Sequence, residues 1–181
     1  ARHQVSMQIR RHERRAIRGS YGSGKSTLFR NRNGVCRPTG GQILYEGRPV
    51  DYSRKGLLEL RRQVGIVFQD PDNQLFCASV AGEISFGLYN LGLDEEEIRR
   101  RVDAVCQKLS IDPFRDKPTH FLSGGQKKRV SIADILVMRP SLLILDEPFS
   151  ALAPKHAQMN DEILSRLARE GLTAVIAHPH A

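Results

Sequence analysis

The sequence predicts an α/β fold built on a mainly parallel sheet, and three apolar segments carry this prediction. Leu142–Leu145 is continuously apolar, which is typical of a parallel strand covered on both faces. Val64–Phe68 is a second compact apolar run, and Thr173–Ala177 is a third. Because stretches with helical spacing separate these runs, strands alternate with helices, as in α/β domains. A length of 181 residues suits one such domain and is hardly enough for two.

The first element with a chemical signature is a loop at residues 19–27 that fits the pattern G-x-x-x-x-G-K-[ST]. Glycines let the backbone curve closely around phosphates, so that successive N–H groups point at the oxygens. Lys25 supplies a mobile charge for the β- and γ-phosphates, and the Ser26 hydroxyl can ligate Mg²⁺. A helix from Ser26 to about Arg32 would direct its positive end at the nucleotide. A flexible Gly/Ser turn is the alternative. The predicted nucleotide-binding residues here are Gly19, Ser20, Tyr21, Gly22, Ser23, Gly24, Lys25, Ser26 and Thr27.

Two shorter elements follow this loop. Gly41–Val50 predicts a hairpin that turns at Glu46-Gly47. The strand at Val64–Phe68 then ends at Gln69, and the turn-forming residues Asp70–Asn73 come next.

The segment between Gln69 and Ser123 predicts a helical insertion. Asp94 is a good helix N-cap, and Glu97 stands three residues later, as in a capping box. Asp112-Pro113 marks the end of this helix. The apolar positions that recur at helical spacing are Ile98, Val102, Val105 and Leu109.

Ser123-Gly124-Gly125-Gln126 opens the next predicted helix, which ends before Pro140. The Ser123 hydroxyl, two unobstructed glycine amides and the helix dipole together suit a γ-phosphate. A helix cap without a ligand is the alternative. A further helix around 158–169 leads to the last strand.

Asp146 and Glu147 follow the buried strand Leu142–Leu145 directly. A parallel strand delivers such residues to the carboxyl edge of the sheet, where ligands bind in these folds. Asp146 can hold Mg²⁺ through its water shell, and Glu147 can orient or deprotonate an attacking water. The alternative is an ordinary strand end.

These motifs together resemble the nucleotide-binding domain of ATP-binding cassette (ABC) proteins. The resemblance implies a P-loop NTPase with a parallel sheet core, a small antiparallel β subdomain and a helical signature subdomain at about 75–138. It covers residues 1–181 as a single domain, which we expect to be truncated at both ends. It further implies ATP and Mg²⁺ as ligands, and a second ATPase subunit, identical or paralogous. The signature of that partner, the counterpart of residues 123–126, would face the ATP.

Site roles follow from the same resemblance. Gln69 matches the loop glutamine that senses Mg²⁺ and the attacking water, and His178 matches the switch histidine at the γ-phosphate. The implied catalytic residues are therefore Glu147, His178 and Gln69, and the implied metal-site residues are Ser26, Gln69 and Asp146.

The stretch Asp70-Pro71-Asp72-Asn73-Gln74 is similar to the energy-coupling-factor branch of the family, as is Lys127–Val130. This branch implies an ATPase that drives uptake of cobalt, nickel or vitamins. Its partners would be a transmembrane coupling subunit and a substrate-binding membrane subunit. We therefore expect the chain at the cytoplasmic face of the cell membrane.

Five positions depart from the family pattern. Ala153 stands where an Asp is usual, and Tyr21 stands where a small polar residue is usual. The resemblance implies that both positions lie on the contact between subunits, so an ATP-binding module with impaired hydrolysis, or a decayed copy, is an alternative function. Arg18, Asn31 and Arg32 replace apolar residues, and each must reach solvent or a partner.

Composition bears on the remaining classes of protein. The net charge is +8, with arginines concentrated in the first quarter, but basic and aromatic residues do not alternate as in RNA-binding sheets. We therefore expect a solvated basic surface and no nucleic acid, with a soluble cassette acting on DNA or ribosomes as a further alternative. Cys36, Cys77 and Cys106 are widely spaced, which does not fit a zinc or disulfide framework. No apolar run approaches the ~20 residues of a membrane span.

Overall fold

A computed structural model describes residues 6–20, 22–148, 150 and 152–179. Its core is a sheet of four strands in the order β1 (Arg14–Gly19), β6 (Thr173–Pro179), β5 (Leu142–Leu145) and β4 (Val64–Val67). All three strand pairings are parallel, which confirms the predicted α/β class. Because every strand points the same way, the segments that follow β1, β4 and β5 emerge at one edge.

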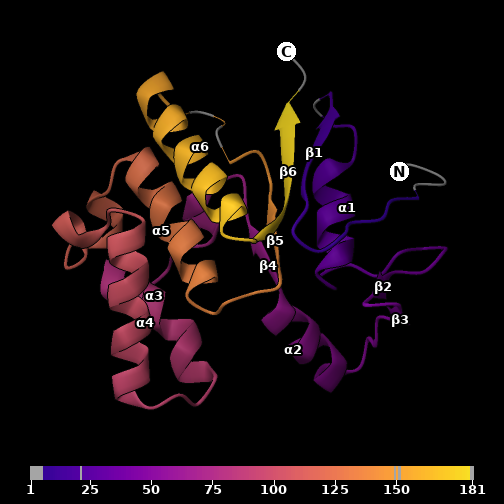
Figure 1. Ribbon diagram of the computed structural model, residues 1–181, viewed down its shortest axis with the longest axis horizontal. Coiled ribbons are helices and arrows are strands. Elements are labelled where there is room, and N and C mark those ends of the chain that lie inside the picture. The colour runs from indigo at the N-terminus through magenta and orange to yellow at the C-terminus, as the bar shows by residue number, and fades with distance from the viewer. Residues whose placement is uncertain (1–5, 21, 149, 151, 180–181) are drawn as a thin grey trace.

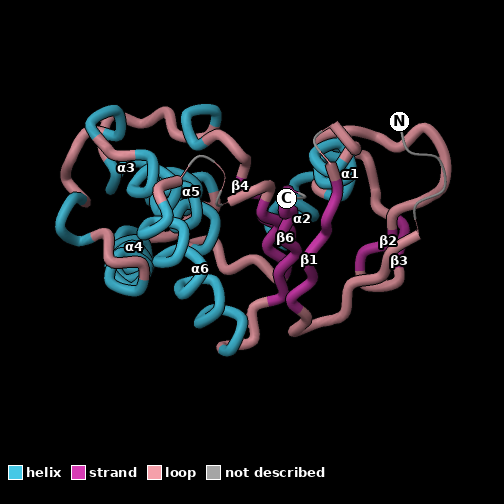
Figure 2. Tube along the Cα trace, turned by 90° about the horizontal axis from the view of Figure 1, so that it is seen from above, coloured by secondary structure: helices cyan, strands magenta, loops and turns pink. Residues whose placement is uncertain are grey.

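Helices cover both faces of this sheet. In Figures 1 and 2, α1 (Lys25–Arg32) and α2 (Arg54–Gln63) lie on one side. The other side carries α3 (Val80–Asn90), α4 (Glu95–Lys108), α5 (Gly124–Leu136) and α6 (Pro154–Arg169). Three short 3₁₀ helices complete the connections: η1 (Pro71–Asn73), η2 (Asp112–Phe114) and η3 (Thr119–Phe121).

The predicted hairpin is present as a separate two-stranded sheet. β2 (Leu44–Tyr45) pairs antiparallel with β3 (Arg48–Pro49). Glu46 and Gly47 have φ values of 51° and 77°, as a tight turn with two left-handed residues requires. The turn therefore falls where the sequence indicated.

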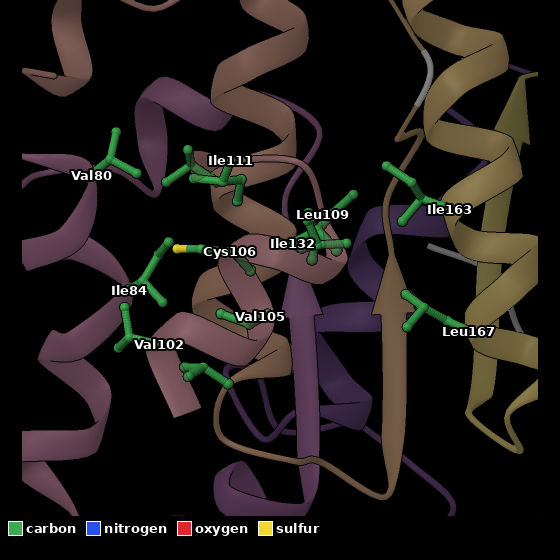
Figure 3. Packing of buried hydrophobic residues seen from close by; sticks show 14 of the residues in the cluster. Val80, Ile84, Val102, Val105, Cys106, Leu109, Ile111, Ile132, Ile163 and Leu167 are labelled. Atoms are coloured by element: carbon green, nitrogen blue, oxygen red, sulfur yellow. The ribbon is translucent and has the colours of Figure 1, made fainter. Parts of the chain in front are cut away.

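The sheet separates two apolar cores. The larger one joins α3, α4, α5 and α6 to β5, and Figure 3 shows part of it, including Ile84, Cys106, Ile132 and Leu167. The smaller one lies under α1 and α2. Its buried members are Phe29, Leu60, Val64, Ile66, Ile144, Val175 and Ala177.

Gly65 in β4 fixes how closely α5 approaches the sheet. A Cβ at this position would lie 2.1 Å from Cγ2 of Ile135 in α5 and 3.4 Å from Cγ of Pro140. Real carbon atoms do not come that close, so only glycine allows this packing. The glycine therefore helps to position the helix that begins after Ser123.

The helix caps agree with the sequence at α5 and only in part at α4. At α5, Ser123 and Gln126 form the complete reciprocal capping box. At α4, Asp94 accepts a hydrogen bond from Glu97 N at 2.9 Å. The Glu97 carboxylate, however, accepts hydrogen bonds from Arg100 and Arg101 on its own helix, and no return bond to Asp94 is formed. Arginines three and four residues away thus replace half of the expected box.

Arg18 and Arg32, which stand where the family has apolar residues, are accommodated in different ways. Arg18 is exposed on β1, where its charge meets solvent. Arg32 is half-buried: its Nη2 donates to Met7 O at 3.2 Å, while its Nε is buried without a hydrogen-bond partner. Burial lowers the pKa of Arg32. Among the described helices, none is both long and apolar enough to cross a membrane.

Candidate functional site

The loop between β1 and α1 has the backbone geometry of a phosphate cradle. Gly22 and Gly24 have φ values of 75° and 88°, a conformation that favours glycine. At Gly19 the chain passes close to Ser23, whose Oγ would lie 2.6 Å from a Cβ at this position. Ser23 Oγ is buried without a hydrogen-bond partner. The loop therefore holds an unused polar group of the kind that a bound phosphate satisfies.

Lys25 is folded back onto its own loop. Its side chain is 6% exposed, and Nζ donates to Gly19 O at 2.7 Å and to Ser20 O at 3.2 Å. Nζ also lies 3.2 Å from Oε1 of Glu147. The ammonium is thus balanced by a carboxylate and two carbonyls, which a buried charge requires.

Glu147 is the point at which two other predicted site residues, Gln69 and Lys25, meet. Its Oε2 accepts a hydrogen bond from Gln69 Nε2 at 3.2 Å, while its Oε1 pairs with Lys25. The pairing of Val67 with Leu145 brings the ends of β4 and β5 together and so creates this contact. Glu147 has a φ of 45°, which is uncommon outside glycine and is typical of functional sites.

Asp146 fits a role near a metal ion. It is buried, and its Oδ1 has no hydrogen-bond partner. A buried carboxylate oxygen without a partner is costly, and the water shell of Mg²⁺ would satisfy it. No group of three His, Cys, Asp or Glu side chains suited to a metal occurs within the described ranges. The predicted Mg²⁺ set differs from such a group, because it joins one carboxylate to the Ser26 hydroxyl and the Gln69 amide.

His178 lies beside the start of the phosphate loop. It pairs with Arg18 in the β1–β6 register, one residue before Gly19. Burial and the positive charges of Arg14 and Arg18 lower the pKa of His178, and Asp161 opposes this shift. The ring is therefore held toward its neutral form.

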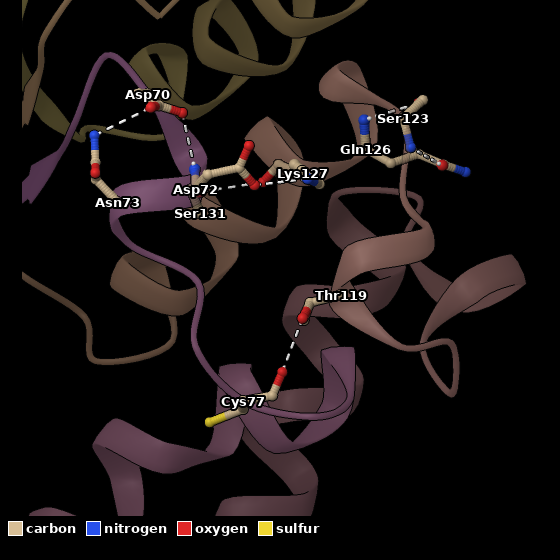
Figure 4. A network of polar contacts seen from close by, with 9 residues as sticks. All are labelled: Asp70, Asp72, Asn73, Cys77, Thr119, Ser123, Gln126, Lys127 and Ser131. Atoms are coloured by element: carbon tan, nitrogen blue, oxygen red, sulfur yellow. Dashed lines mark hydrogen bonds and ion pairs between the residues drawn. The ribbon is translucent and has the colours of Figure 1, made fainter.

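Ser123–Gln126 stands apart from the phosphate loop of the same chain. Ser123 and Gly124 are exposed, and Figure 4 shows Ser123 and Gln126 joined at the start of α5. Ser123 N donates to Gln126 Oε1 at 2.9 Å. Figure 2 shows α5 and α1 on opposite sides of the sheet, so the exposed start of the signature lies apart from the helix that follows its own phosphate loop.

The loop after Gln69 is fastened to α5, a feature that the sequence did not predict. Lys127 Nζ lies 2.6 Å from Asp72 Oδ1, as Figure 4 shows. Gln74 Nε2 donates to Ser131 O at 2.9 Å. Lys128 turns inward beneath the same loop, and burial lowers its pKa to about 8 against the attraction of Asp70 and Asp146. The sequence offers no local signal for the Lys128 contact, because α5 is buried all along 128–133 and the acceptors are backbone carbonyls.

Ala153 and Tyr21 are the two departures from the family pattern at the expected contact between subunits. Ala153 is exposed at the N-cap of α6, where it makes no side-chain cap. Tyr21 lies outside the described residues.

The chain is similar to known proteins over nearly its whole length. The ABC transporter family model matches residues 2–150. The energy-coupling factor transporter ATP-binding protein EcfA3 of Clostridium perfringens is 52% identical over 174 residues, which are 96% of this chain and 61% of that protein. The EcfA protein of Methanocaldococcus jannaschii is 43% identical over 173 residues, covering 96% of this chain and 62% of its own length. The chain thus spans about three fifths of these relatives.

Two solved structures have the same fold. CbiO1 of Clostridium perfringens, part of the ABC transporter complex cbiONQ, has a TM-score of 0.90 at 51% identity, over 97% of this chain and 70% of its own. A dimeric ATP-binding cassette in a post-hydrolysis state with ADP and Pi has a TM-score of 0.86 at 28% identity. That match covers 98% of this chain and 78% of the cassette.

Proposed function

This chain belongs to the ABC transporter family, and on that premise we propose that it is the ATP-hydrolysing subunit of an energy-coupling-factor importer. The observation that carries the proposal is the convergence of Lys25 and Gln69 on Glu147. It joins a phosphate-binding loop, a polar sensor and a general base within hydrogen-bonding reach.

Each residue has a defined task in this proposal. Lys25 leaves Glu147 and the loop carbonyls to bind the β- and γ-phosphates, and the release frees the Glu147 carboxylate to accept a proton from water. Gln69 orients that water, and His178 contacts the γ-phosphate through a neutral ring. Mg²⁺, when bound near Ser26, Gln69 and Asp146, would supply charge neutralisation at the phosphates.

A second subunit completes the site in this proposal. Two exposed residues of the signature, Ser123 and Gly124, have no phosphate loop of their own chain before them. A copy or a paralogue would place its own phosphate loop there, so that each ATP lies between two subunits. Gly19–Thr27 of one chain and Ser123–Gln126 of the other would then bind one nucleotide.

The membrane partners follow from the branch and from the surface after Gln69. Phe76 is 68% exposed and packs edge-on against Phe86, which is itself exposed, as is Tyr89. We place the contact with a transmembrane coupling subunit on this aromatic surface. A separate membrane subunit would bind the cargo, a cobalt or nickel ion or a vitamin. This assembly holds the chain at the cytoplasmic face of the membrane.

Steady-state hydrolysis by the full-length chain tests the proposal. In the Glu147→Gln variant we expect kcat to fall by about 100-fold or more, because the general base is lost, while ATP is still bound. Glu162→Gln is the matched control, since Glu162 is an exposed glutamate on α6. Equal turnover in wild type and Glu147→Gln would refute the assignment.

An ATP-binding module with impaired hydrolysis is the second candidate. The specific observation in its favour is the exposed methyl group of Ala153 at a position where a carboxylate is expected. Restoring that carboxylate distinguishes the two functions, as described in the Discussion.

A further inference from the structure

Lys128 is a buried lysine that none of the steps above uses. Only 1% of its surface is exposed, although it lies two residues after Gln126 near the start of α5. Its Nζ donates to Phe68 O at 2.8 Å and to Gln69 O at 2.6 Å. A buried ammonium is tolerated only where such acceptors meet it. The ammonium of Lys128 is therefore bound by the backbone at Gln69, the residue whose side chain contacts Glu147.

The contacts form one continuous path from α5 to the candidate base. Lys128 holds the carbonyl of Gln69, and the Gln69 amide in turn donates to Glu147 Oε2 at 3.2 Å. The carboxylates of Asp70 and Asp146 add attraction for the ammonium from two sides. A shift of α5 would therefore move the backbone of Gln69 with it.

We propose that Lys128 is a positioning residue for ATP hydrolysis. Its ammonium ties the backbone of Gln69 to the helix that begins after Ser123, and this tie holds the Gln69 side-chain amide against Glu147. This inference rests on the proposed ATP hydrolysis. It links the signature helix to Gln69 through a side chain that donates to backbone carbonyls.

Lys127 provides the matched control, because it belongs to the same helix and contacts the same loop. Its Nζ pairs with the side chain of Asp72, which is 65% exposed. Lys127 itself is 19% exposed, but its partner carboxylate lies largely in solvent and the bond ends on a side chain, so loss of this pair leaves the backbone of Gln69 in place.

The test compares three variants of the full-length chain: Lys128→Met, Lys128→Gln and Lys127→Met. For Lys128→Met we expect kcat to fall about 30-fold, because two charge-assisted hydrogen bonds are lost, with KM and the Kd for a fluorescent ATP analogue within about twofold of wild type. Lys128→Gln keeps N–H donors and should recover most of kcat. Lys127→Met should match wild type. In nucleotide-free protein, hydrogen exchange of the peptide Phe68–Gln74 should rise in Lys128→Met alone.

Each outcome decides the proposal. Wild-type kcat in Lys128→Met overturns it. A loss of kcat that Lys128→Gln fails to recover, and that follows a drop in Tm, assigns Lys128 a merely structural role and also overturns it. If wild type itself hydrolyses no ATP, the proposed function fails separately. Hydrogen exchange of the peptide Phe68–Gln74 then still tests whether Lys128 holds the backbone of Gln69. Unchanged exchange in Lys128→Met refutes this role, and a local rise in exchange supports it.

Discussion

Replacing Gly65 by alanine should force α5 away from the sheet. The new Cβ would lie 2.1 Å from Cγ2 of Ile135. Carbon atoms pack at about 3.5–4.0 Å, so the overlap is roughly 1.5 Å and cannot be absorbed by a rotamer change alone. Overpacking of this kind costs typically ~1–3 kcal/mol, and we expect Gly65→Ala to lower the free energy of unfolding by about 2 kcal/mol.

The branch of Ile135 is the cause of this clash, so its removal should relieve it. Leucine keeps the volume of isoleucine but lacks the Cγ2 branch at Cβ. In a double-mutant cycle, Gly65→Ala combined with Ile135→Leu should recover about 1 kcal/mol relative to the sum of the single changes. The measurement is urea unfolding with a common m-value.

Gly40→Ala is the matched control, since a Cβ there meets nothing within 4 Å. We expect its free energy of unfolding to stay within about 0.5 kcal/mol of wild type. Two results would refute the reasoning: Gly65→Ala as stable as Gly40→Ala, or strictly additive effects in the cycle with Ile135.

Three further predictions concern charge and capping. Burial raises the pKa of Asp134 to about 7 from 3.8, so the folded state retains a proton that the unfolded chain has lost. The free energy of unfolding should therefore fall as pH rises from about 4 to 7, and Asp134→Asn should flatten that slope in unfolding measured across pH. Arg32→Met removes a buried Nε that has no partner, and should leave the Tm unchanged or higher, because an unpaired buried donor costs about 1–3 kcal/mol; a clear fall in Tm would count against this. Ala153→Asp supplies the missing N-cap of α6 and should stabilise the protein by about 1 kcal/mol in urea unfolding. Together with Tyr21→Asn it should also raise kcat if the chain is impaired; unchanged turnover would exclude impairment at these positions.

Local sequence patterns predicted β4, β5, β6, the hairpin and four of the six described helices, because each pattern reports a single physical demand. Continuous apolar residues at Leu142–Leu145 require a strand covered on both faces, and Ser123 with Gln126 requires a helix start. The helix Val80–Asn90 was expected only as part of a helical insertion, and the helix Arg54–Gln63 was not predicted. Its Ser53 cap and the leucines at 57, 58 and 60 were valid signals, but a glycine in the first turn lowers the helix propensity of so short a segment.

The sequence named candidate-site residues but did not predict the contacts between them. Motifs named Lys25, Gln69 and Glu147, because each residue type serves a known chemical need. That Lys25 rests on Glu147 depends on how β1, β5 and β4 align, which no local pattern encodes. The contacts of Lys128 could not be predicted for a related reason. Its partners are backbone carbonyls about 60 residues away, and every residue has a carbonyl, so the sequence does not indicate which ones are used.

Mixing two inactive variants and measuring ATP hydrolysis tests most directly whether each nucleotide is bound between two chains. Lys25→Ala should disable the phosphate loop, and Ser123→Arg should disable the signature. Mixed in equal amounts, half of the dimers combine the two variants, and each of these regains one intact site. We predict that the mixture recovers about a quarter of wild-type ATP hydrolysis, although each variant alone is inactive. A mixture as inactive as its two components would contradict a site shared between two copies of this chain.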